Sequence, residues 1–229
     1  FNHVIEVTNR RVPVIAGTGN NHTKASIELT KKADELGADG IMLVTPYYNR
    51  PNQRGMIEHF SAIAQETRLP VMLYNIPSRS VVHMTAETVI RLSEIDNIVA
   101  IKDSSGDLDH LSEIIERTKE DFHVYSGDDG MTLPILSIGG KGVVSVASHI
   151  IGNEMKKIIT TFQNGQNKEA AMLHRRYLPI IKSLFQAPSP APVKAALSLK
   201  GIDVGSVRRP LVGLTDQELS ALKGALQLN

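Results

Sequence analysis

The chain has 229 residues, of which 41% are hydrophobic and 21% charged, with a formal net charge of +1. This composition is that of a globular protein, and the near-neutral charge gives no electrostatic reason to expect a nucleic-acid or membrane partner. The chain contains no cysteine, which excludes disulfides, thiolate nucleophiles and thiolate metal ligands and fits a reducing compartment such as the cytoplasm.

Short β-branched runs recur along the chain, and a helical pattern follows each of them. The runs are apolar almost throughout, which is typical of strands in a parallel sheet that is covered on both faces. Their starts are about 20–30 residues apart, the length of one strand and one crossover helix. The predicted strands are 12–16, 40–45, 71–75, 98–102, 123–126 and 143–147.

Helices are predicted between these strands, with their charged residues on solvated outer faces. One runs from 25 to 36 and stops before Gly37, a second spans 56–67, and Thr85 can cap a third. Beyond residue 150 the pattern is helical only, and we expect helices at 154–163, 167–186, 190–200 and 215–228.

The order of these elements favours a (β/α)8 barrel followed by a C-terminal helical extension. A barrel needs about eight strands, and six are predicted here. We expect two strand–helix units, about 60 residues, before Phe1, because residues 1–7 have the pattern of the end of a helix. The expected domains are a partial barrel at 1–150 and a helical region at 151–229. A doubly wound sheet is the main alternative, but Gly17-Thr18-Gly19 lacks the third glycine of a dinucleotide-binding loop.

Lys102 closes the fourth predicted strand, where parallel barrels carry their reactive groups. Desolvation at the end of an apolar strand lowers a lysine pKa, and a neutral amine can attack a keto carbon to form an imine. The alternative is that Lys102 pairs with Asp103 or Asp128 at the strand end. Position alone does not separate these two interpretations.

Other strand ends carry side chains that suit imine chemistry. Tyr74 and Tyr48 have phenol hydroxyls that can donate and accept protons, although a tyrosine there is often only packing. Arg79 follows Pro77 in a rigid turn, and its planar guanidinium suits a carboxylate, the alternative being an uninvolved surface arginine.

We expect the polar residues Asp128, Asp129 and His149 to have structural roles. We expect Asp128 and Asp129 to cap a loop rather than to bind a metal, since no histidine or glutamate clusters beside them. His149 is read in the same way, as a packed loop residue. No metal site is predicted.

Taken together, the strand-end segments closely resemble the dihydrodipicolinate synthase family of the N-acetylneuraminate lyase superfamily. The resemblance covers essentially the whole chain, with the segments in order. They are PVIAGTG (13–19), TPYYNRP (45–51), LYNIPSRS (73–80), VAIKDSSG (99–106), YSGDD (125–129), KGVVSVAS (141–148) and PSPAPVKAAL (188–197).

The resemblance implies a lyase of lysine and diaminopimelate biosynthesis that needs no metal or organic cofactor. Lys102 would form an imine with pyruvate, and the enamine would attack L-aspartate semialdehyde. Tyr74 would relay protons, and Tyr48 would complete the relay in a neighbouring subunit of a dimer of dimers. Arg79 would bind the semialdehyde carboxylate, and the backbone at Gly127 and Val144 would line the pyruvate pocket.

The resemblance also raises questions about regulation and completeness. Asn21 and Tyr47 match positions that line a lysine effector cleft, but Ala25 replaces a glutamate of regulated members, which argues against lysine inhibition. The family's Gly-Thr-Thr-Gly-Glu segment, which cradles the pyruvate carboxylate, would lie before Phe1. The alternatives are a sister aldolase for another aldehyde, and a truncated relic that no longer turns over substrate.

Overall fold

The computed structural model describes residues 1–227, and the chain divides into two compact units. The first unit consists of residues 1–127 and 137–142. The second consists of residues 128–136 and of the chain from residue 143 onward. The predicted α/β class is confirmed, since the first unit carries parallel strands and the second is helical.

The strands form one six-stranded sheet whose spatial order follows the chain order from β1 to β6. The pairings from β1 to β5 are all parallel. The order contains no reversal, whereas a doubly wound sheet reverses at its switch point. The strands are β1 (Ile15–Gly17), β2 (Gly40–Val44), β3 (Val71–Asn75), β4 (Ile98–Asp103), β5 (His123–Ser126) and β6 (Gly142–Val143).

The first and last strands are shorter than predicted, and side-chain hydrogen bonds explain both differences. Strand β1 begins only at Ile15, because the backbone N–H of Val14 donates to Asp39 Oδ2 at 2.7 Å instead of joining a ladder. Strand β6 was expected to reach residue 147 but ends at Val143. There the N–H groups of Val146 and Ala147 donate to Asp129 Oδ2, at 3.0 and 3.1 Å.

Helices follow the strands of the first unit as predicted, and polar caps fix where they begin. Thr85 caps α5 by accepting from the N–H of Thr88, as expected. Two helices begin earlier than predicted because His22 and Asn52 cap them. The helices are α1 (Asn2–Thr8), α2 (Thr23–Glu35), α3 (Gln53–Ala64), α4 (Pro77–Ser80), α5 (Ala86–Leu92) and α6 (Leu108–Arg117).

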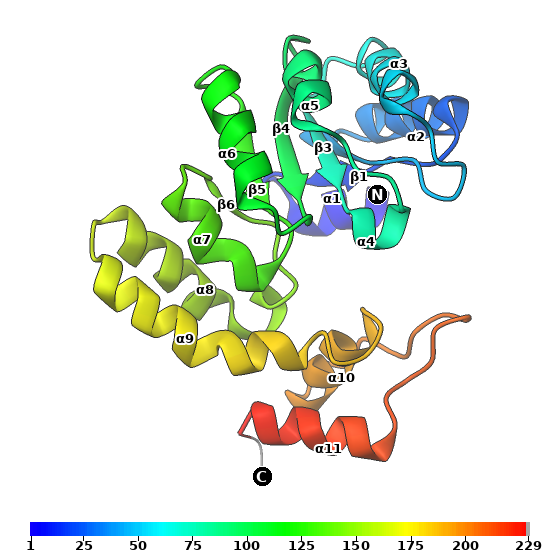
Figure 1. The fold of residues 1–229 in the computed structure, drawn as a ribbon. Helices are drawn as coiled ribbons and strands as arrows, with labels where there is room; N and C mark the ends of the chain where they lie inside the picture. Colours follow the sequence, from blue (N-terminus) through cyan, green and yellow to red (C-terminus); the bar gives the residue numbers. More distant parts are fainter. Residues whose placement is uncertain (228–229) are drawn as a thin grey trace. The chain divides into compact units, whose positions relative to one another are not determined.

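The two faces of the sheet differ in burial. Helices α2, α3, α5 and α6 lie on one side of the strands (Figure 1). On that side Ile41, Leu43, Leu73 and Ile101 are fully buried. Met42, Tyr74 and Lys102 on the opposite face are only half-buried. Among the described residues this face is more accessible than the helix-covered one at these three positions, although Met72 and Ala100 of the same face are 8% and 3% exposed.

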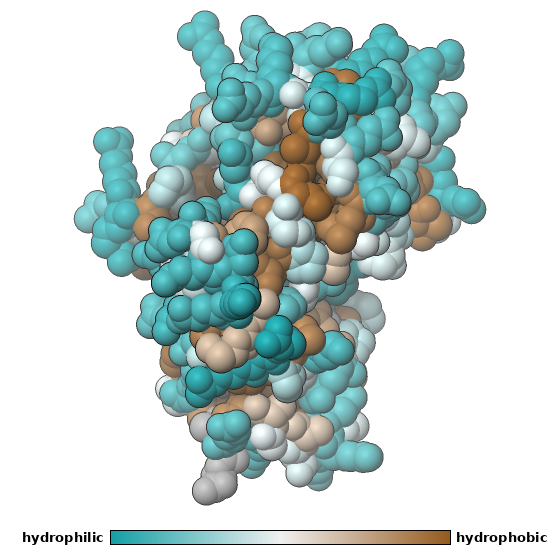
Figure 2. Space-filling model, turned by 60° about the vertical axis from the view of Figure 1, so that its left-hand side comes forward, coloured by the Kyte–Doolittle hydropathy of each residue, from teal (hydrophilic) through white to brown (hydrophobic). Residues whose placement is uncertain are grey.

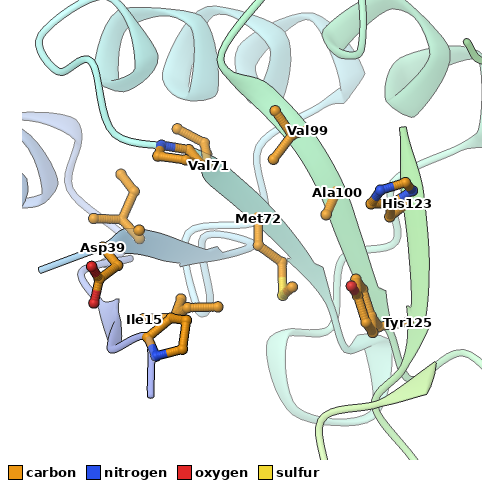
Figure 3. A pocket seen from close by; sticks show the side chains of 12 residues that line it. Ile15, Asp39, Val71, Met72, Val99, Ala100, His123 and Tyr125 are labelled. Carbon is orange, nitrogen blue, oxygen red and sulfur yellow. The ribbon is translucent and has the colours of Figure 1, made fainter. Parts of the chain in front are cut away.

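The half-buried face encloses a pocket of about 180 Å³ near the amino ends of the strands. Figure 3 shows Met72, Ala100 and Tyr125 pointing into it from neighbouring strands. Its lining is mostly apolar. The other residues around it are Pro13, Ile15, Asp39, Gly40, Ile41, Pro70, Val71, Val99 and His123.

The second unit is built from helices around its own core. Ile158, Leu184, Ala196 and Leu222 are fully buried there. The helical region was predicted, but α8 begins at Ser148 rather than 154 and is interrupted by a non-helical Ile151. The elements are η1 (Asp129–Met131), α7 (Thr132–Ser137), α8 (Ser148–Gln163), α9 (Asn167–Ser183), α10 (Ala191–Leu199) and α11 (Asp216–Ala225).

The charged residues of the helices lie on solvent-exposed faces, as expected. Figure 2 shows polar side chains over most of one face of the molecule, with hydrophobic surface between them. Arg117 of α6 bridges Glu87 and Glu113 on such a surface. Within residues 1–227, no helix is both long enough and apolar enough to cross a membrane.

Candidate active site

The carboxyl ends of β3 and β4 bring two predicted site residues together. Tyr74 lies directly opposite Lys102 in the ladder, and Lys102 Nζ is 3.8 Å from the centre of the Tyr74 ring. Parallel partners point to the same face of a sheet, so both side chains project from the half-buried face. The amine and the phenol that imine chemistry requires are therefore neighbours.

A register shift between the two strands produces this pairing. Val71 pairs with Ile98 but Met72 pairs with Ala100, so β4 contains one extra residue, Val99, near its start. If the register continued unshifted from the first pair, Tyr74 would lie opposite Ile101, and Lys102 would face the helices. A slip of one residue turns every later side chain to the other face.

Gly127 comes next to Lys102 at the end of β5. Its N–H donates to the carbonyl of Asp103 at 2.6 Å. A Cβ at this position would lie 2.0 Å from Ser104 Oγ and 3.0 Å from Lys102 Cε. The backbone of residue 127 therefore forms a wall of the lysine's surroundings, and only glycine fits there unless neighbouring atoms move.

The half-buried position of Tyr74 changes the pKa of its phenol. Burial raises the pKa of Tyr74 above its ordinary value; the neighbouring Ser104 hydroxyl and the charge of Arg79 act against burial, and the charge of Asp103 acts with it. The net effect keeps the hydroxyl protonated. A protonated phenol can donate to a substrate oxygen and can pass a proton on.

Arg79 is exposed on the short helix α4, which begins at Pro77 shortly after β3. The turn is held by Ser80, whose hydroxyl lies within hydrogen-bond distance of the carbonyls of Ile76 and Val82, at 2.9 and 3.0 Å. Thr45, the residue after β2, donates in turn to Ser80 Oγ at 2.8 Å. Arg79 thus stands on a braced turn near the Tyr74 phenol, with its guanidinium open to solvent.

The loop after β2 carries Tyr47 and Tyr48 away from the lysine. The side chain of Tyr48 is 88% exposed, with a left-handed backbone at φ 74°. A ring so exposed is not packed against Tyr74 or Lys102 within this chain. Asn21 Nδ2 donates to the carbonyl of Tyr47 at 3.1 Å, which brings the two predicted effector positions together.

Asp128 and Asp129 cap loops in the second unit, as expected. The Asp128 side chain accepts from the N–H of Gly130. His149 was expected to be packed in a loop but is exposed in the first turn of α8. Val144 is half-buried between β6 and α8 in the same unit. Among residues 1–227, no three histidine or acidic side chains gather as metal ligands would.

A buried polar network behind Tyr74 and Lys102 was not identified from the sequence. Asn75 and Asp103, the next residues of the two strands, are fully buried and hydrogen-bonded to each other at 2.7 Å, with His83 and His110 beside them. The sequence signal was a polar residue directly after each site residue in an apolar strand. Asp103 was weighed only as a partner of Lys102, yet it points to the opposite face.

A sequence profile of the Dihydrodipicolinate synthetase family matches residues 1–229 of the chain. The 4-hydroxy-tetrahydrodipicolinate synthases of Bacillus velezensis and Bacillus subtilis are 61% and 60% identical to it, over 99% of this chain and 78% of theirs.

Solved structures give the same result. The crystal structure of dihydrodipicolinate synthase from Bacillus anthracis superposes with a TM-score of 0.97 at 59% identity, covering 99% of this chain and 77% of that one. A synthase from Cyanidioschyzon merolae with lysine bound gives a TM-score of 0.95 at 46% identity, over 100% of this chain and 80% of that one.

Proposed function

The chain belongs to the dihydrodipicolinate synthetase family, and from that membership we propose that it is a 4-hydroxy-tetrahydrodipicolinate synthase. It condenses pyruvate with L-aspartate semialdehyde in lysine and diaminopimelate biosynthesis, through an imine on Lys102. The observation that carries this assignment is the placement of Lys102 Nζ 3.8 Å from the Tyr74 ring at two paired strand ends. Such a biosynthetic enzyme works in the cytoplasm.

Lys102 supplies the nucleophile. Its neutral amine attacks C2 of pyruvate, and loss of water gives an imine whose protonated nitrogen withdraws electrons. Loss of a proton from C3 then gives an enamine, which attacks the aldehyde carbon of the semialdehyde while the aldehyde oxygen takes up a proton. To give the cyclic product, the amino group of the adduct replaces the Lys102 nitrogen at C2 and frees the enzyme.

Tyr74 carries protons in these steps. Its raised pKa keeps the hydroxyl available as a donor to the departing water and to the aldehyde oxygen. Tyr48 completes the relay from a neighbouring subunit, a role that its 88% exposure supports. Contacts through the exposed Tyr47 and Tyr48 fit a symmetric interface, in a homo-oligomer that we propose to be a dimer of dimers.

The substrates are held by groups around the lysine. A Cβ on residue 127 would lie 3.0 Å from Lys102 Cε, so pyruvate at the lysine would meet the backbone of Gly127. Arg79 binds the carboxylate of the semialdehyde, because its exposed guanidinium stands on the braced turn after β3. Asn21 and Tyr47 line an effector cleft, in which Ala25 supplies no carboxylate for lysine.

The six strands of the sheet are proposed to belong to a (β/α)8 barrel. Residues 1–150 contribute to the barrel, and residues 151–229 form the last barrel helices and the C-terminal helical region. Support comes from the uninterrupted strand order and from the half-buried face, whose apolar pocket is lined from several strands as a barrel interior is.

Borohydride trapping tests the proposed function. The full-length protein is incubated with pyruvate, reduced and mapped by peptide mass, and an adduct is expected on Lys102, with Lys102→Arg as the unreactive control. No adduct in the folded wild type would refute the imine mechanism. An adduct without turnover of L-aspartate semialdehyde would indicate a sister aldolase.

A further inference from the structure

Asn75 and Asp103 form a second pair of partners directly after Tyr74 and Lys102. The two pairs are consecutive in the ladder between β3 and β4. Because side chains alternate along a strand, Asn75 and Asp103 point to the helix-covered face while Tyr74 and Lys102 point away from it. Asn75 is 0% exposed and Asp103 is 1% exposed.

The carboxylate of Asp103 has hydrogen-bond partners at both oxygens. Oδ2 accepts from Asn75 Nδ2 at 2.7 Å. Oδ1 accepts from the N–H and the hydroxyl of Ser105, at 2.8 and 2.6 Å. Asn75 Oδ1 accepts from the N–H of Met84 at 3.1 Å. The hydrogen bond between Asn75 and Asp103 therefore links β3 to β4. The same two side chains also bind the loop after β4 and the segment before α5.

Two histidines extend this network to the surrounding helices. Asn75 Nδ2 lies 3.0 Å from His83 Nδ1. The ring of His110 in α6 lies against that of His83, tilted by 53° with ring centres 4.6 Å apart, and its Nε2 is 3.8 Å from Asp103 Oδ2. A buried carboxylate costs free energy unless polar groups surround it, and in this cluster the amide, the serine and the histidines surround Asp103.

We propose that Asn75 and Asp103 are positioning residues for Lys102 and Tyr74, which they hold in register from the opposite face of the sheet. The proposal rests on the imine chemistry proposed above. Neither side chain touches substrate. Their hydrogen bond holds the ends of β3 and β4 in one register. This register sets the distance from the Lys102 amine to the Tyr74 ring. Misplacement of reacting groups by about 1 Å can slow a reaction about 100-fold.

Exchange of the two residues tests this role. In Asp103→Asn an amide faces the Asn75 amide, and in Asn75→Asp two carboxylates face each other. The double variant Asn75→Asp/Asp103→Asn restores the pair with its polarity reversed. In it the carboxylate introduced at position 75 still accepts from Met84, and the amide oxygen introduced at position 103 still accepts from Ser105. The rate of imine formation with pyruvate is measured by rapid quenching in borohydride, with KM and melting temperature alongside.

The single variants are expected to form the imine about tenfold or more slowly, with a KM for pyruvate within about twofold of wild type. The double variant is expected to recover to within about threefold. Asn97→Ala is the matched control. Asn97 donates to the carbonyls of Ala64 and Thr67 just before β4, so its loss should lower the melting temperature and leave the imine rate unchanged.

Two results would overturn the proposal: a folded double variant as slow as the single variants, or single variants that react at the wild-type rate. If the single variants do not fold, Asn75→Ser removes the amide without adding a charge, and a wild-type rate in it is equally decisive. Wild-type protein that forms no adduct at all refutes the imine mechanism itself. The two failures are therefore distinguishable.

Discussion

Replacement of Gly127 by alanine is a direct test of the wall beside Lys102. The new Cβ would lie 2.0 Å from Ser104 Oγ and 3.0 Å from Lys102 Cε. Ordinary carbon–oxygen contact is about 3.4 Å, so the serine hydroxyl must move by about 1.4 Å and the lysine by a few tenths of an ångström. The hydroxyl can rotate, which limits the loss of unfolding free energy to about 1–3 kcal/mol. The lysine cannot move without displacing its amine.

We therefore expect Gly127→Ala to fold and to form the pyruvyl imine about 100-fold more slowly. Single-turnover borohydride trapping gives the rate, and denaturant unfolding gives the stability. The double variant Gly127→Ala/Ser104→Ala removes the 2.0 Å contact but keeps the one with Lys102. It should regain stability, and unfolding alone is measured in it because the Ser104 hydroxyl also acts on the Tyr74 phenol.

Gly213→Ala is the control, because a Cβ there would meet nothing within 4 Å. It should match the wild type in both measurements. A Gly127→Ala protein that forms the imine at the wild-type rate would show that residue 127 does not confine the lysine.

Two further predictions concern substrate binding and stability. Arg79→Ala should raise KM for the semialdehyde about tenfold or more in steady-state kinetics and leave imine trapping intact; equal loss of both would remove Arg79 from the substrate role. Burial lowers the pKa of His59 from 6.5 to about 4, so the unfolded chain takes up its proton first as the pH falls. Stability should be unaffected above about pH 7 and fall by about 3 kcal/mol between about pH 6.5 and 4, because the His59 side chain is buried. His59→Gln should flatten that fall in denaturant unfolding at about pH 7 and pH 4.5, and an unchanged slope would contradict the assignment.

The sequence was informative wherever one local signal decides the structure. Apolar runs with polar ends located the strands, and the position of Lys102 at such an end followed from them. Thr85 was recognisable as a cap because a cap is a local choice of residue and backbone. For the same reason Asp128 was recognisable as a loop-capping residue.

Long-range hydrogen bonds explain what the sequence left open. The end of β6 depends on Asp129, which lies 17 residues before Val146 and withdraws its N–H from the ladder. The pairing of Asn75 with Asp103 is tied to the register between two strands, which shifts by one residue near the start of β4. Neither residue type nor hydrophobic period contains this information. Pairing across 28 residues therefore became visible only in three dimensions.

The extra residue Val99 also bears on how this strand can change in length during evolution. Loss of its codon would remove the irregularity and leave Tyr74 opposite Lys102, because the ladder from Ala100 onward is already set. Loss of the codon for Ile101, two positions later, would turn the lysine toward the helices. A single deletion near the start of β4 thus keeps the lysine on its face, whereas a single deletion near the lysine reverses that face.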